Sequence, residues 1–100
     1  MHTLATRILD ELSEALEDFG THSFDDKGAG EVMGTGELGY ALRKLAPPDA
    51  AVVLLEVARD PRHKKRGLRV AEALVLELQD WEALFELPGI DDLMKGKLPP

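Results

Sequence analysis

Residues 68–87 carry the most regular alternation of hydrophobic and polar positions in the chain, and its period is that of an α-helix. At about 100° per residue, one narrow face collects Val70, Leu74, Leu78, Trp81 and Phe85. A second apolar stripe, on another side, consists of Ala73, Leu76, Ala83, Leu84 and Leu87. A helix that is apolar on two sides needs neighbours on both. The pattern therefore predicts one continuous helix over residues 64–87, placed centrally or at a subunit contact.

Three shorter helices are predicted before it. Residues 3–19 form an apolar stripe with acidic flanks, and Gly20 ends the pattern. Residues 37–46 and 49–59 make two further helices, each closed by a proline that cannot continue it. The helix over 49–59 is apolar on most sides, so we expect it to be buried or sandwiched. Its polar strip consists of Asp49, Glu56 and Arg59, with Val52 between them.

The remaining segments are predicted to be irregular. Residues 20–36 hold five glycines among seventeen residues, which indicates a long loop after the first helix that is either functional or mobile. Residues 90–94 can add one last turn, and residues 96–100 are expected to fray. The sequence thus predicts an all-α fold, a small four-helix domain over residues 1–95 with a Gly-rich loop.

Composition supports a single globular domain. The chain has 100 residues, of which 44% are hydrophobic and 31% charged, and this size allows one modest core. Cysteine is absent, which excludes disulfides and thiolate metal sites and suits a reducing compartment. The N-terminus does not resemble a secretory signal, and no apolar run approaches the length of a membrane span. We expect a cytoplasmic protein with no membrane partner.

The charge is distributed unevenly along the chain. The formal net charge is −7, yet residues 62–69, RHKKRGLR, carry five basic residues and no acid. This basic cluster lies between acidic segments. Because most of the surface would repel phosphate, nucleic acid is not an expected partner. Cations at the start of a helix also oppose its dipole, and this cost must be offset. The alternatives are pairing with the acidic first helix or simple solvation, and contact with an acidic partner surface or a phosphate group.

The segment from Leu38 to Leu78 is similar to HEAT repeats, as a helical pair of the short form found in phycobilisome-lyase-like arrays. The likeness lies in ALRKLAPPDAAVVLLEVARDPRHKKRGLRVAEALVLEL, where a helix ends in LAPPD, an apolar helix ends in Asp60-Pro61, and a basic segment leads into AEAL. Four positions repeat in character 32 residues apart: Leu38 with Val70, Gly39 with Ala71, Ala41 with Ala73, and Leu42 with Leu74. The resemblance implies helical hairpins that serve as an interaction scaffold, with no catalytic residue.

The loop SFDDKGAGEVMGTGEL is similar to a degenerate EF-hand loop between two helices. A calcium loop needs oxygen ligands at its positions one, three, five and twelve. Those positions hold Asp25, Lys27, Ala29 and Gly36, so only the first can ligate through its side chain. Tight calcium binding is therefore not expected.

No set of residues indicates catalysis or a cofactor. His22, Asp25 and Asp26 cluster in the glycine-rich loop, but no second histidine follows at helical spacing, so we expect no metal site. The glycines of the loop lack the preceding strand and the Lys-Ser/Thr pair of a phosphate-binding loop. Ser13 lies on a helix, without the strand–turn–helix context of a nucleophile. We expect a protein that is not an enzyme.

Two functions fit the sequence. The first is a non-catalytic protein–protein interaction module, a small acidic helical adaptor that could form a homodimer. The alternative is an acidic inhibitor or immunity-type protein whose carboxylates block a basic nuclease or nucleic-acid-binding surface. The alternative requires the acids of the first helix to be exposed and contiguous with those of residues 77–92. The candidate partner-binding residues are Glu11, Glu14, Glu17, Asp18, Arg62, Lys64, Lys65, Arg66, Leu76 and Leu87.

Overall fold

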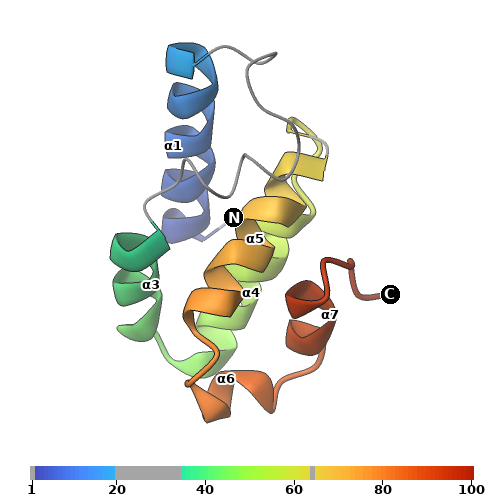
Figure 1. The fold of residues 1–100 in the computed structure, drawn as a ribbon. Helices are drawn as coiled ribbons and strands as arrows, with labels where there is room; N and C mark the ends of the chain where they lie inside the picture. The colour runs from blue at the N-terminus through green and yellow to red at the C-terminus, as the bar shows by residue number, and fades with distance from the viewer. Residues whose placement is uncertain (1, 20–34, 64) are drawn as a thin grey trace.

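The computed structural model describes residues 2–19, 35–63 and 65–100, with side chains described only up to Ala15 in the first range. Within these ranges the chain forms helices and no strand, which confirms the all-α prediction (Figure 1). The predicted loop lies mostly outside the described residues, as do His22, Asp25 and Asp26. The helices are α1 (Thr3–Phe19), α3 (Thr35–Arg43), α4 (Pro47–Ala58), α5 (Lys65–Glu77), α6 (Glu82–Phe85) and α7 (Ile90–Met94).

The helix α4 lies at the centre of this arrangement. It contacts α1, α3, α5 and α6, and its most extensive contact is with α5. Pro47 and Pro48 occupy its first turn, where the missing N–H groups would have no intrahelical partner. The prediction of a buried or sandwiched helix is confirmed, since half of its 12 residues are buried: Ala50, Ala51, Val53, Leu54, Val57 and Ala58.

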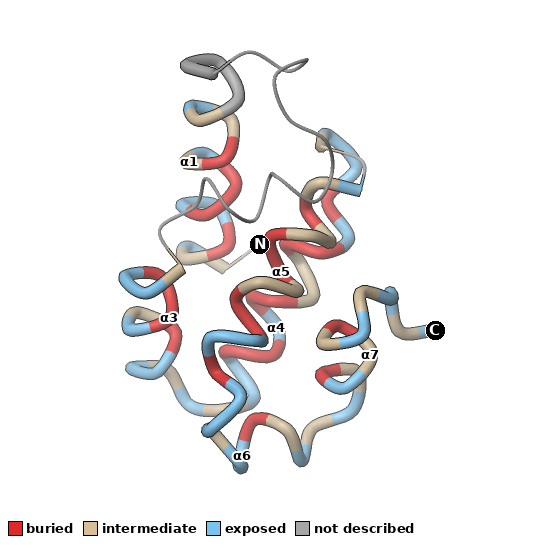
Figure 2. Tube along the Cα trace, in the orientation of Figure 1, coloured by how far each residue is buried: buried red, intermediate tan, exposed pale blue. Residues whose placement is uncertain are grey.

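The apolar stripes of the other helices close over α4. In Figure 2 the buried residues of α1, α3 and α5 lie on the sides that face one another. The fully buried large side chains include Ile8, Leu9 and Leu12 of α1, Leu42 of α3, and Leu74 of α5. Burying such a side chain contributes roughly 1.5–3 kcal/mol, so this core supplies most of the stabilisation.

The prediction of one continuous helix over residues 64–87 is wrong. The helix α5 ends at Glu77, and a turn over residues 78–81 leads into the short helix α6. Leu74 and Leu78 are fully buried as expected. Trp81 lies beyond the break and is only partly buried, although it packs against the core.

An interaction from α3 accompanies this break. Arg43 donates a hydrogen bond to the backbone oxygen of Glu77 at 3.3 Å and another to the Asp80 carboxylate. Arg43 therefore supplies a hydrogen-bond donor to a backbone oxygen in the last turn of α5, where the helix itself offers no further N–H partner. The hydrogen bond from Arg43 also lowers the pKa of Asp80. The segment contains neither glycine nor proline, so its sequence alone carried no stop signal.

The break also redistributes the second apolar stripe. Leu84 turns inward and is fully buried, whereas Leu76 remains 45% exposed on α5. Leu87 is partly buried against the core. The stripe predicted to contact a neighbour is therefore not one continuous surface.

Helices α4 and α5 approach each other closely at Gly67. A Cβ atom at this position would lie 2.4 Å from the backbone oxygen of Val57 and 3.7 Å from Cβ of Asp60. The first distance is far below van der Waals contact, and a backbone oxygen within a helix cannot rotate away. Only glycine permits this hairpin between α4 and α5.

We predict that Leu74→Ala destabilises the protein by about 2–5 kcal/mol, because it removes a fully buried side chain and leaves a cavity. Urea unfolding followed by circular dichroism measures this loss. An unchanged midpoint would contradict the described core.

We predict that Gly67→Ala destabilises the protein by about 1–3 kcal/mol or more, because the added methyl group overlaps the Val57 carbonyl. In an ordinary helix the same change is favourable by up to about 1 kcal/mol. The control is Gly36→Ala in the first turn of α3, where the nearest atom of the described residues would be 4.0 Å from the new Cβ. The control is expected to be neutral or stabilising in the same urea titration, and equal effects at both positions would contradict the close approach.

Candidate functional site

The outward face of α4 is the least covered part of the central helix. Val52 is 47% exposed there, with Asp49 and Arg59 also exposed and Glu56 half-buried. These are the residues that the sequence places on the polar strip, and this position of the strip is confirmed. An exposed β-branched side chain in the middle of it gives this face an apolar centre.

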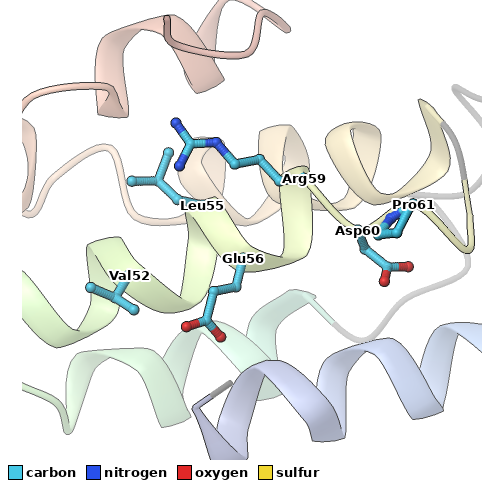
Figure 3. A pocket seen from close by; sticks show the side chains of 6 residues that line it. All are labelled: Val52, Leu55, Glu56, Arg59, Asp60 and Pro61. Carbon is cyan, nitrogen blue, oxygen red and sulfur yellow. The ribbon is translucent and has the colours of Figure 1, made fainter.

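A shallow groove of about 440 Å³ runs along this face (Figure 3). Its lining is mostly apolar, and it lies against one side of α4 and the turn that follows. In the close-up, Glu56 points toward α1, whereas Arg59 extends on the opposite side, over Leu55. The lining residues are Val52, Leu55, Glu56, Arg59, Asp60 and Pro61.

Two other parts of the chain lie beside the groove. The backbone N–H of His2 donates to Glu56 Oε2 at 2.9 Å, which places the start of α1 along one edge. On the other edge is Gly89, where a Cβ atom would lie 3.6 Å from Cδ2 of Leu55. Gly89 has φ +92° and begins α7, so the direction of the chain here requires glycine.

The charged side chains of the groove differ in whether another group of the chain binds them. Glu56 accepts the His2 hydrogen bond, and Asp60 pairs with Arg62 at 3.2 Å. Among the described residues, no carboxylate lies within ion-pair distance of the exposed Arg59 guanidinium. The groove therefore combines an apolar centre with one cation that this part of the chain leaves unpaired.

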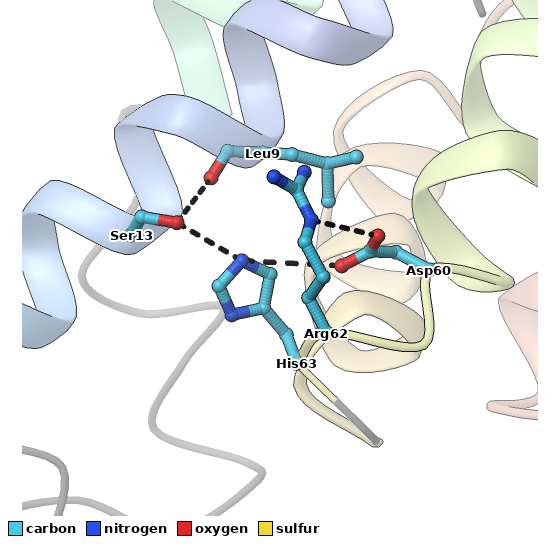
Figure 4. Close-up of polar contacts among 5 residues, drawn as sticks. All are labelled: Leu9, Ser13, Asp60, Arg62 and His63. Atoms are coloured by element: carbon cyan, nitrogen blue, oxygen red, sulfur yellow. Dashed lines mark hydrogen bonds and ion pairs between the residues drawn. The ribbon is translucent and has the colours of Figure 1, made fainter.

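A buried polar cluster lies behind the end of the groove, at the turn between α4 and α5 (Figure 4). Asp60 is 5% exposed, and its carboxylate accepts a hydrogen bond from Arg62 Nε. His63 Nε2 lies 3.1 Å from Ser13 Oγ of α1 and 3.9 Å from Asp60 Oδ2. The cluster connects α1 to the turn over a separation of fifty positions in the sequence.

The direction of these hydrogen bonds can be inferred from the serine. Ser13 donates its hydroxyl hydrogen to the backbone oxygen of Leu9 at 3.1 Å, so its oxygen is left as an acceptor. His63 then carries its proton on Nε2 and donates to Ser13. In a catalytic triad the acid and the serine bond to different ring nitrogens, but here both lie nearest the same one. The geometry is that of a connection between helices and does not activate the serine.

Burial lowers the pKa of His63; Asp60 opposes this effect, and Arg62 and Arg66 add to it. The imidazole side chain is only 11% exposed, so water screens these charges weakly. The cluster therefore favours neutral His63.

The acidic candidates lie along α1. Glu14 is exposed, whereas Glu11 is half-buried and pairs with Arg7 at 3.8 Å. Glu17 and Asp18 belong to the last part of α1, where side chains lie outside the described set. Figure 1 places α1 and α6 at opposite ends of the molecule. Glu77, the first acid of residues 77–92, lies instead beside α3, since a Cβ atom at Gly39 would be 3.0 Å from its Cγ.

The basic candidates are only partly available. Arg62 pairs with Asp60, and Lys65 is exposed at the first position of α5. Arg66 is half-buried, and Lys64 lies outside the described residues. Arg62 thus pairs with the buried carboxylate of Asp60 in its own turn, and not with the first helix as one alternative predicted.

Comparison with family models, with curated proteins and with solved structures finds no match for this chain. The HEAT-like and EF-hand-like resemblances therefore stay predictions. In the part of the chain that is described, no helix has both the length and the apolar character needed to cross a membrane. Over the same residues, no group of three or more histidine, aspartate or glutamate side chains is placed to hold a metal ion.

Two features of this site were not predicted. The contact between Ser13 and His63 has no local signal, because its partners are far apart in the sequence and meet only after α1 packs on α4. The position of the groove had a sequence signal, since Val52 interrupts an otherwise polar strip. One apolar residue on a strip does not, however, predict that a groove lies there.

We predict that acidification weakens the fold through His63. An unfolded histidine titrates near 6.5, and the folded pKa is lower, so the unfolded state binds more protons below about pH 6.5. The stabilisation present above that pH is lost as the pH falls through the folded pKa.

The measurement compares the wild type with His63→Gln, which does not titrate and keeps a donor for Ser13. Urea unfolding at several values between about pH 7.5 and pH 5.5 should show a larger loss of unfolding free energy for the wild type than for the variant. Parallel pH profiles would contradict the described environment of His63.

Proposed function

We propose that this protein is a non-catalytic protein–protein interaction module, and that the groove along α4 is its contact surface. The observation that carries the proposal is the mostly apolar groove on the outward face of the central helix. Val52 lies in it and is 47% exposed, although half of the residues of α4 are buried. Grooves of this kind are a common way for a protein to bind a segment of a partner.

The groove suits a protein segment better than an enclosed small molecule. A bound small molecule usually has most of its surface covered, which requires a closed pocket. This groove is shallow and open along one side of a rigid helix. A partner side chain can cover Val52 and Leu55 while the rest of the partner remains outside.

The inhibitor or immunity-type alternative is less well supported. Mimicry of phosphates calls for one continuous acidic surface, but α6, which carries Glu82, lies at the opposite end of the molecule from α1. Glu11 and Glu37 are also partly neutralised, since both pair with Arg7. An adaptor needs no such surface, so we prefer the interaction module.

We predict that Val52→Asp weakens partner binding without loss of stability. The side chain is half exposed, so a carboxylate there remains hydrated in the free protein but must be desolvated under a partner. Affinity capture from cells of the source organism identifies the partner, and titration calorimetry with the purified partner measures a loss of roughly tenfold or more.

The matched control is Leu76→Asp on α5, where the side chain is 45% exposed but does not line the groove. This variant is expected to keep its affinity, and both variants are expected to keep the wild-type melting temperature. A partner lost by Leu76→Asp and retained by Val52→Asp would instead place the contact on α5, as the second apolar stripe of the sequence first indicated.

A further inference from the structure

The charges around the groove restrict the chemistry of its partner. Both acids in the lining are already engaged, because Glu56 accepts from the His2 backbone and Asp60 accepts from Arg62. Arg59 is exposed, and no described carboxylate pairs with it. Among its described side chains, the groove thus offers one unpaired positive charge, at Arg59. Glu56 keeps its negative charge, because a backbone N–H does not neutralise it, but it lies on the opposite side of α4 from Arg59.

The position of Arg59 places this charge beside the apolar centre. In Figure 3 its side chain extends over Leu55, with the guanidinium on the side away from Glu56. Arg59 and Leu55 are also one turn apart on α4, since the Arg59 N–H donates to the Leu55 oxygen at 3.0 Å. A group bound on Leu55 therefore lies within about one helical turn of Arg59, and a group bound on Val52 lies about two turns away.

We propose that the groove binds a segment of another protein that presents a large apolar side chain with an aspartate or glutamate about one helical turn away. The apolar side chain covers Val52 and Leu55, and the carboxylate pairs with Arg59. A guanidinium and a carboxylate can form two parallel hydrogen bonds, so this pair fixes orientation as well as charge. The inference rests on the proposed function, because it assigns the chemistry of the partner for the same groove.

A peptide selection tests this specificity. Random 12-residue peptides are displayed on phage and selected on the wild type, on Val52→Asp and on Arg59→Glu. The most enriched wild-type sequences are then synthesised and titrated against each protein. Lys65→Glu is the control, because it makes the same change of charge at an exposed position that does not line the groove.

The expected result has three parts. Peptides selected on the wild type depend on Val52 and carry an acidic residue near a large apolar one. Their affinity falls roughly tenfold or more in Arg59→Glu and much less in Lys65→Glu, because only the first charge lies at the bound carboxylate. Peptides selected on Arg59→Glu carry lysine or arginine in place of the acid.

Each failure has its own meaning. Peptides that depend on Val52 but show no acidic preference and no response to Arg59→Glu would overturn this inference and leave the proposed function standing. A selection that yields no Val52-dependent peptide would contradict the proposed function itself.

Two other occupants are tested in parallel. Sedimentation that shows a dimer of the wild type, lost in Val52→Asp, would assign the groove to a second copy of this chain and overturn the inference. Sodium octanoate offers the same apolar and carboxylate groups as a free molecule. Binding of octanoate more tightly than any selected peptide would also overturn it.

Discussion

The contact between Gly67 and the Val57 backbone oxygen is the constraint on which the other features of this structure depend. It brings the start of α5 against the end of α4, where no side chain would fit. The turn between the helices is thereby held close to the core. Asp60 and His63 consequently lie beneath α1, and Pro61 forms the end of the groove. A larger separation of α4 and α5 would displace the polar cluster and the groove together.

Apolar burial and polar contacts have different roles in this fold. Each fully buried large side chain contributes roughly 1.5–3 kcal/mol, whereas exposed ion pairs such as Arg7–Glu37 contribute about 0–1 kcal/mol. The core therefore supplies most of the stability. The buried Asp60 gains little net energy from its partners, since its desolvation offsets the attraction. Its contacts instead determine how α1 lies against the turn.

The sequence predicted the features that depend on neighbouring residues in the chain. It missed the features that depend on contacts between different helices. Helix ends marked by proline were found to within two or three residues, because proline acts on its own backbone. The break after Glu77 was missed, since it involves Arg43, a residue on another helix. For the candidate site, the polar strip of α4 followed from helical spacing. The depth of the groove depends on where His2 and Gly89 pack, and no local pattern encodes that.

The edges of the groove have a practical consequence for attaching tags and labels. Because His2 binds a side chain of the lining, a tag fused ahead of it starts beside the groove. An apolar tag there competes with a partner at an effective concentration on the order of millimolar. Pro99 packs near Gly89 at the other edge, so a tag after Pro100 has a similar problem. The chain has no cysteine, and a single cysteine in place of the exposed Tyr40 on α3 gives a unique attachment point on a helix that does not line the groove.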